Sequence, residues 1–169
     1  MKVDKERWAA FYSKLLEKNA LNLLVSHHIN SYNDFVLRRV QRIIDEIGEV
    51  ELSQKYGGFK LVFGKVRFGK PFIKEADGFE REITPMEARI RNLNYTCPLM
   101  VEVTPIIGGI EKEQTTIKIC DFPIMINSVI DPYSNLSPEE KIELGEDPTD
   151  PGGYFIINGV EKVIVGMEE

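Results

Sequence analysis

Cysteine and histidine, the residues that most often bind metals or act in nucleophilic catalysis, are scarce in this sequence. It contains two cysteines, Cys97 and Cys120, and two adjacent histidines, His27 and His28. Two cysteines are too few for a disulfide framework and their spacing suits no metal site, so we expect buried free thiols in a reducing compartment. Adjacent side chains on a helix or strand point apart, which makes joint metal binding by the histidines difficult. We therefore predict no catalytic and no metal-binding residue.

Long apolar segments are also missing. No stretch approaches the ~20 apolar residues of a membrane span, and charges interrupt the first eight positions, where a signal peptide needs an apolar core. We therefore expect a cytoplasmic protein that contacts no membrane. Basic residues number 21 against 27 acidic ones, for a net charge of −6. Because phosphate binding depends on clustered Lys and Arg, this balance argues against a free-standing nucleic-acid-binding protein.

The remaining composition is that of a single globular domain. The chain has 169 residues, of which 43% are hydrophobic and 28% are charged. A chain of this length buries roughly two thirds of the surface that its unfolded form exposes, which is enough for a real core. We therefore treat residues 1–169 as one domain.

Four segments carry helical patterns. Residues 31–48, 84–94 and 137–145 each begin with Ser or Thr followed three positions later by an acidic residue, the spacing of an N-terminal capping box. An apolar stripe follows the first of these caps and stops at Gly48, which is typical of a helix end. Residues 4–18 place Trp, Phe, Tyr and Leu at helical spacing, which predicts a further amphipathic helix.

The segments between these helices have strand patterns. Residues 50–73 interleave Phe and Val with Lys and Arg and are punctuated by glycines, which predicts short antiparallel strands with bulges or turns. Residues 99–107 and 114–126 are rich in β-forming residues and are separated by Gly108-Gly109, which indicates a hairpin.

A second hairpin is predicted near the end of the sequence. The apolar runs 154–157 and 160–165 flank Asn158-Gly159, a pair that tolerates the positive φ angles of a type I′ turn. Taken together, the patterns predict an α+β fold with a mainly antiparallel sheet and about three helices.

The stretch from Tyr56 to Lys74 is basic and aromatic and contains no acidic residue. Its basic residues are Lys60, Lys65, Arg67, Lys70 and Lys74. In a strand, Lys65 and Arg67 share one face while Val66 and Phe68 share the other, so a basic face can meet phosphates as the apolar face joins the core. A solvated outer face whose lysines discourage edge-to-edge aggregation explains the pattern equally well. Both interpretations stay open on the sequence alone.

Three further patterns are explained by ordinary structural roles. Residues 58–65 resemble a phosphate-binding loop, but five residues separate the glycines where that motif has four. Asp147 and Asp150 lack the alternating ligands of a calcium loop, and we interpret them as turn residues. A second basic stripe on the helix predicted over residues 31–48 is most simply a solvated face; it consists of Arg38, Arg39 and Arg42.

Residues 150–165 (DPGGYFIINGVEKVIV) form a long and unusual run. Three upstream stretches accompany it in a characteristic order: 28–36 (HINSYNDFV), 95–103 (YTCPLMVEV) and 122–128 (FPIMINS). Together these segments resemble the N-terminal part of the second-largest subunit of multisubunit DNA-directed RNA polymerases. The turn at 145–148 is similar to the archaeal type.

This resemblance implies a fold, a function and a set of partners. The fold would be the first, incomplete part of the protrusion domain, which forms one wall of the polymerase cleft near the RNA–DNA hybrid and the upstream DNA. The chain would support DNA-templated nucleotidyl transfer structurally, as part of an enzyme complex with other polymerase subunits. It would hold no cofactor, since Mg²⁺ in the family is bound mainly by the largest subunit. The resemblance also places Asn158, Glu161 and Lys162 near the hybrid, although a turn and a cross-strand charge pair partly explain these residues.

Two other functions compete with this one. A truncated paralogue that docks on polymerase as a regulatory protein would carry the same motifs. An independent nucleic-acid-binding module would rest only on the basic stretch, and the acidic remainder of the chain counts against it. In each case we expect the isolated chain to synthesise no RNA, because no carboxylate cluster suited to two-metal phosphoryl transfer is apparent.

Overall fold

The computed structural model describes residue 13 and residues 20–52 and 58–166. Apart from Ser13, the helix predicted over residues 4–18 lies outside the described residues. Among the helices that are described, none is both long and apolar enough to span a membrane.

The first described element is one long helix. It consists of α2 (Ala20–Asp34), a π-helical turn η1 (Phe35–Arg39) and α3 (Val40–Ile47). The predicted helix start at Ser31 is wrong, because Ser31 lies inside α2. Ile29, before the expected boundary, packs against the core cluster that contains the buried Tyr32 and Val36 after it, so tertiary packing holds the helix across Ser31. The predicted end at Gly48 is confirmed, and its φ of +59° is one that glycine tolerates well.

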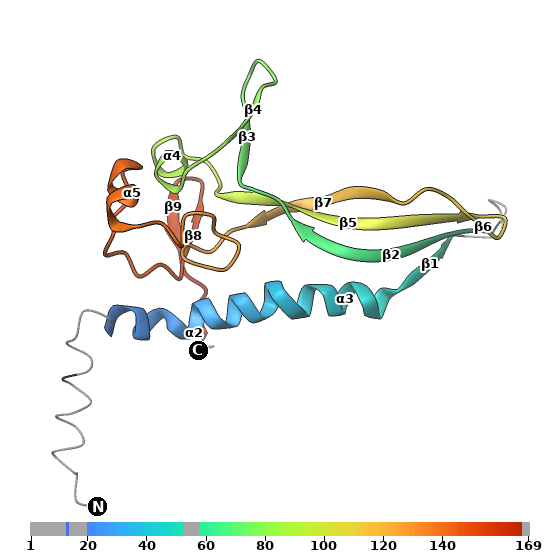
Figure 1. The fold of residues 1–169 in the computed structure, drawn as a ribbon, viewed down its shortest axis with the longest axis horizontal. Helices are drawn as coiled ribbons and strands as arrows, with labels where there is room; N and C mark the ends of the chain where they lie inside the picture. Colours follow the sequence, from blue (N-terminus) through green and yellow to red (C-terminus); the bar gives the residue numbers. More distant parts are fainter. Residues whose placement is uncertain (1–12, 14–19, 53–57, 167–169) are drawn as a thin grey trace, which may run out of the picture.

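An antiparallel sheet lies alongside this helix (Figure 1). Its strands are β1 (Glu49–Leu52), β2 (Phe59–Phe68), β5 (Thr96–Ile107), β6 (Ile110–Glu111) and β7 (Thr115–Pro123). The order is β1-β2-β5-β6, and β7 also pairs with β5. The predicted turn at Gly108-Gly109 is confirmed, with φ values of +59° and +80°.

The smaller elements gather at one end of the sheet (Figure 1). They are the β3 (Phe72–Lys74) and β4 (Glu80–Glu82) hairpin, α4 (Pro85–Ile90), α5 (Pro138–Glu143), and the β8 (Phe155–Ile157) and β9 (Val160–Lys162) hairpin. Both predicted caps are confirmed, since Thr84 accepts from the Glu87 amide and Ser137 forms the complete capping box with Glu140. The helix α4 ends earlier than predicted, because Asn92 adopts a positive φ of 55°.

The main core lies where α4, β5 and β8 meet. Its buried residues are Ile83, Ala88, Tyr95, Cys97, Ile124, Ile126 and Ile156. Cys97 is a buried free thiol, as predicted, but Cys120 is exposed. The prediction fails for Cys120 because most of β7 lies exposed at the edge of the sheet, without cover from other described residues. With α2, η1 and α3 counted as one helix, the described chain has three helices and antiparallel sheets, which confirms the α+β prediction.

Candidate nucleic-acid interface

The outer face of β2 carries the two central residues of the basic stretch. Lys65 and Arg67 are exposed, whereas Val66 and Phe68 are partly buried, so the predicted alternation is confirmed. Arg67 is ion-paired, because its Nη2 lies 2.5 Å from Oε1 of Glu102 on the neighbouring strand β5. Lys65 has no ion-pair partner among the described residues. Of the two cations, Lys65 is therefore the freer to meet a phosphate.

A β-bulge sets the direction of these side chains. The pairing of β2 with β5 shifts register between Phe63 and Val66, a segment that contains Gly64 and Lys65. The side chain of Gln41 on α3 supplies hydrogen bonds to the backbone of this bulge. Its Oε1 accepts from the Val66 amide at 2.8 Å, and its Nε2 donates to the Gly64 carbonyl at 3.2 Å. The inner face of β2 is thereby fixed to the long helix, and the outer face is left for Lys65 and Arg67.

The other three basic residues lie apart from this pair. Lys60 is seven residues before Arg67, roughly 23 Å along a strand at ~3.3 Å per residue, and its Nζ is 3.6 Å from Glu49. Lys70 follows β2 and its Nζ lies 2.5 Å from Glu82. Lys74 is exposed on β3, in a different sheet.

The five cations therefore do not form one uniformly positive patch. Three of them face carboxylates at 2.5–3.6 Å, which cancels much of their field. Exposed ion pairs are weak and screened by salt, so the cations can still exchange a carboxylate for a phosphate. The smaller stripe on the long helix is also paired, because Arg38 and Arg39 contact Asp34 and Arg42 contacts Glu46.

The Asn158-Gly159 turn has the predicted geometry. Both residues hold positive φ, 51° and 73°. The turn is also anchored from outside, since the Asn158 amide donates to Oδ1 of Asn94 at 2.7 Å and the Gly159 amide donates to the Leu93 carbonyl at 2.9 Å. The hairpin is thus held against the segment that follows α4.

The predicted cross-strand charge pair in this hairpin is wrong. The strand partners of Glu161 and Lys162 are Ile156 and Phe155. Glu161 instead accepts from Nε of Arg89 on α4 at 3.0 Å. Lys162 is exposed and has no ion-pair partner among the described residues, so it alone of the hairpin's charged residues remains free.

Arg89 is the centre of a polar cluster that sequence reasoning missed. Besides Glu161, it contacts Oε2 of Glu146 at 2.8 Å and the Tyr154 hydroxyl at 2.7 Å. Tyr154 in turn donates to Asp150, and burial raises the pKa of the Tyr154 hydroxyl. The predicted turn role of Asp150 is also met, because its Oδ1 accepts from the Gly152 amide. The sequence offered little from which to predict this cluster, because Arg89 lies on a short helix and its acidic partners are 57 and 72 residues away.

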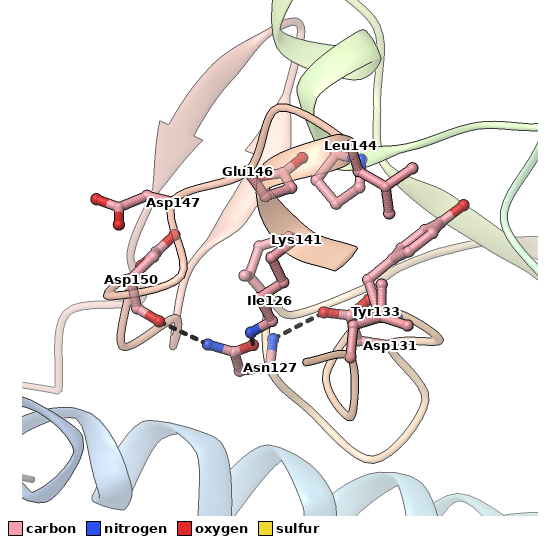
Figure 2. Close-up of a pocket in the computed structure, with 11 residues that line it drawn as sticks. Ile126, Asn127, Asp131, Tyr133, Lys141, Leu144, Glu146, Asp147 and Asp150 are labelled. Atoms are coloured by element: carbon pink, nitrogen blue, oxygen red, sulfur yellow. Dashed lines mark hydrogen bonds between the residues drawn. The ribbon is translucent and has the colours of Figure 1, made fainter. Parts of the chain in front are cut away.

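A small cavity lies beside this cluster (Figure 2). Its volume is about 20 Å³, and its lining includes Asn127, Asp131, Lys141 and Glu146. Asn127 spans the cavity wall, since its amide donates to Asp131 at 2.8 Å and its Nδ2 donates to the Asp150 carbonyl at 2.9 Å. This space holds about one water molecule and is far too small for a nucleotide. Within residues 20–52 and 58–166, no three His, Cys, Asp or Glu side chains are placed to hold a metal ion.

Comparisons with known proteins agree with one another. A family model described as RNA polymerase beta subunit matches residues 23–169. DNA-directed RNA polymerase subunit Rpo2 of Saccharolobus solfataricus is 48% identical over 164 residues, which are 97% of this chain and 14% of the relative. Subunit Rpo2N of Methanocaldococcus jannaschii is 53% identical over 150 residues, which are 86% of this chain and 30% of the relative. The chain thus spans less than a third of the length of either relative.

Proposed function

The chain belongs to the RNA polymerase beta subunit family, and on that basis we propose that it acts as the N-terminal, protrusion-forming region of the second subunit of an archaeal DNA-directed RNA polymerase. The observation that carries this proposal is the family match, because it begins at residue 23 and includes nearly every described element. The region supports DNA-templated transcription structurally. Its partners are other subunits of the polymerase, and its place is the cytoplasm.

The described geometry suits a structural role. A long helix is fixed to one face of the sheet through Gln41, and the terminal hairpin is fixed to α4 through Arg89. Such a framework holds exposed side chains at set positions, and the cavity beside the Arg89 cluster, at about 20 Å³, is too small for a nucleotide. The catalytic carboxylates and Mg²⁺ of nucleotidyl transfer belong, on this proposal, to other parts of the assembled enzyme. The isolated chain then incorporates no nucleotide in a template-dependent assay, and incorporation by contaminant-free protein would contradict this.

Within the complete enzyme, the outer face of β2 lies near nucleic acid and contributes weak, non-specific attraction. Lys65 is the principal group, because it is exposed and lacks a carboxylate partner among the described residues. Binding by this chain alone would be no tighter than the usual non-specific range of about 10⁻⁴ to 10⁻⁶ M. In the assembly, neighbouring subunits hold the nucleic acid at high local concentration, so even a weak contact matters.

The competing functions have less support. Relatives named as polymerase subunits align over 86% of this chain or more, so a regulatory role as a truncated paralogue is not favoured. An independent nucleic-acid-binding module is opposed by the dispersed cations and their carboxylate partners.

The test is a charge-neutralised variant of the complete polymerase, with Lys65, Arg67 and Lys70 changed to Gln. We expect a less stable elongation complex and a weaker dependence of that stability on salt. The matched control changes three other cations to Gln, Arg38, Arg39 and Arg42, which alters the net charge equally on the long helix. A single Lys65→Gln variant separates the unpaired cation from the paired ones. If the β2 variant and the control behave alike, the basic stretch is only a solvated face.

A further inference from the structure

The β3–β4 hairpin projects from the body of the chain (Figure 1). Its strands have three residues each, and the residues from Ala76 to Glu80 are exposed at the tip. Among them is Phe79, whose side chain is 64% exposed. A large aromatic ring presented to solvent on a protruding tip is the kind of group that anchors protein interfaces, because it buries much area at little entropic cost.

The tip has a defined backbone conformation. The Glu75 amide donates to the Phe79 carbonyl, and the Gly78 amide donates to the Glu75 carbonyl, both at 2.9 Å. The Phe79 amide donates to Oδ1 of Asp77, also at 2.9 Å. Gly78 takes a φ of +86°, which few other residues tolerate. The ring of Phe79 is therefore displayed from a hydrogen-bonded turn, which lowers the entropy lost when it binds.

The base of the hairpin is tied to the body by a network of four charges. Arg91 donates to both Glu75 oxygens at 2.8 and 3.0 Å, and Arg81 donates to Glu75 and to Glu87 of α4. Hydrogen bonds from Arg91 and Arg81 lower the pKa of Glu75 to about 2, and those from Arg81 and Arg91 lower the pKa of Glu87 to about 2. Because Ala88 of α4 is fully buried, the network connects the hairpin to the core.

The charge of the hairpin limits what it can bind. Residues 75–82 (EADGFERE) contain four acids and one base, Arg81, whose charge is already matched by Glu75 and Glu87. Of the two neighbouring lysines, Lys70 is paired with Glu82 at 2.5 Å, and Lys74 lies at the exposed end of β3. Glu75 is also paired with Arg91, so the hairpin charges without an ion pair among the described residues are Asp77, Glu80 and Lys74, a balance of −1 that disfavours contact with the phosphates of nucleic acid. The hairpin is attracted to a protein surface on which basic residues surround an apolar pocket.

We propose that the β3–β4 hairpin is a protein-docking element, in which Phe79 inserts into an apolar pocket rimmed by Lys or Arg on another protein of the transcription complex. The proposal rests on the proposed function only for placing that partner in the transcription complex. The hairpin and the outer face of β2 then have different ligands, a basic protein surface and nucleic acid. Docking of the hairpin would fix the position of the partner relative to α4 and the core behind it.

The experiment places the photoreactive residue p-benzoylphenylalanine at position 79 of the subunit in the polymerase assembled with its initiation and elongation proteins. After irradiation, we expect a crosslink to a protein segment in which apolar residues are flanked by Lys or Arg. Ile90 is the matched control position, because it is 69% exposed but lies at the end of α4, away from the tip. The same probe at Ile90 should not reach that segment.

Variants then test the chemistry of the contact. The crosslinked protein, once identified, is titrated against polymerase with Phe79→Ala, Phe79→Leu or Glu80→Lys in the hairpin; Glu80 is exposed and has no ion-pair partner among the described residues. Loss of the anchor in Phe79→Ala should weaken binding about tenfold or more, whereas Phe79→Leu retains most of it. Glu80→Lys reverses a charge of the tip and should weaken binding most at low salt.

Three results overturn the proposal: a crosslink from position 79 to nucleic acid or to a second copy of this chain, the absence of any crosslink, or equal binding by Phe79→Ala and the parent. Because these variants keep the outer face of β2, subunit assembly and transcript synthesis report separately on the proposed function.

Discussion

The Asn158-Gly159 turn permits a quantitative test of how the terminal hairpin is held. Gly159 has a φ of +73°, and a Cβ added to it would lie 2.8 Å from the Arg89 carbonyl oxygen and 2.8 Å from both Cα and Oδ1 of Asn92. Contacts this short do not occur without movement of the chain, and the first two atoms belong to the backbone. Gly159→Ala therefore forces the hairpin away from the segment after α4, and the bond from its amide to the Leu93 carbonyl is strained.

Gly109 supplies a matched control for the backbone conformation alone. It has a similar φ of +80°, but no other atom lies within 4 Å of an added Cβ. In both variants alanine adopts a left-handed conformation, which costs about 1–2 kcal/mol. Only Gly159→Ala adds the cost of overpacking, about 1–3 kcal/mol. We therefore expect Gly109→Ala to lower the free energy of unfolding by about 1–2 kcal/mol and Gly159→Ala by about 2–5 kcal/mol. A β-branched residue, as in Gly159→Val, should cost more again.

The assay is urea unfolding of the 169-residue chain followed by far-ultraviolet circular dichroism. The urea concentration at the midpoint of unfolding should fall, while the dependence of the unfolding free energy on urea concentration stays constant. A change in that dependence would indicate that the substitution alters the unfolded or the native state. Equal losses of stability in Gly159→Ala and Gly109→Ala would refute the reasoning. Such a result would mean that the close approach of the hairpin to Asn92 has no energetic consequence.

Glu75 and Glu87 have a pKa of about 2 in the folded chain against a usual 4.5, so their ionised forms stabilise the fold above pH 4.5. The free energy of unfolding should therefore fall as the pH is lowered from about 4.5 to 2, and Glu87→Gln should flatten that dependence. Gln41→Ala leaves two backbone groups of the β2 bulge without their partner and should cost about 1–3 kcal/mol in urea unfolding, whereas no loss would show that water replaces the amide. Cys120 is exposed and Cys97 is buried with a pKa raised by burial to about 11, so a thiol reagent should modify one cysteine in the native chain and both in urea.

The elements that the sequence predicted correctly depend on short-range interactions. The caps at Thr84 and Ser137 join residues three positions apart, and the Asn158-Gly159 turn needs only two residues that tolerate positive φ. The outward direction of Lys65 and Arg67 on β2 was also predictable, because the strand backbone points successive side chains to opposite faces of the sheet. In each case the residues that decide the structure are close neighbours in the chain.

Tertiary structure decided what distant residues do. The helix continues through Ser31 because Ile29 before it and Tyr32 after it pack in one cluster with Met125 and Phe155, about 90 to 130 residues away. This packing outweighs a local capping signal. The ion pairs of the candidate interface are equally remote: Arg67 meets Glu102 across 35 positions of the sequence, and Arg89 meets Glu161 across 72. Local rules assign conformation to a residue and its neighbours. They do not identify which carboxylate neutralises a given cation, because the packing of whole elements brings the two together.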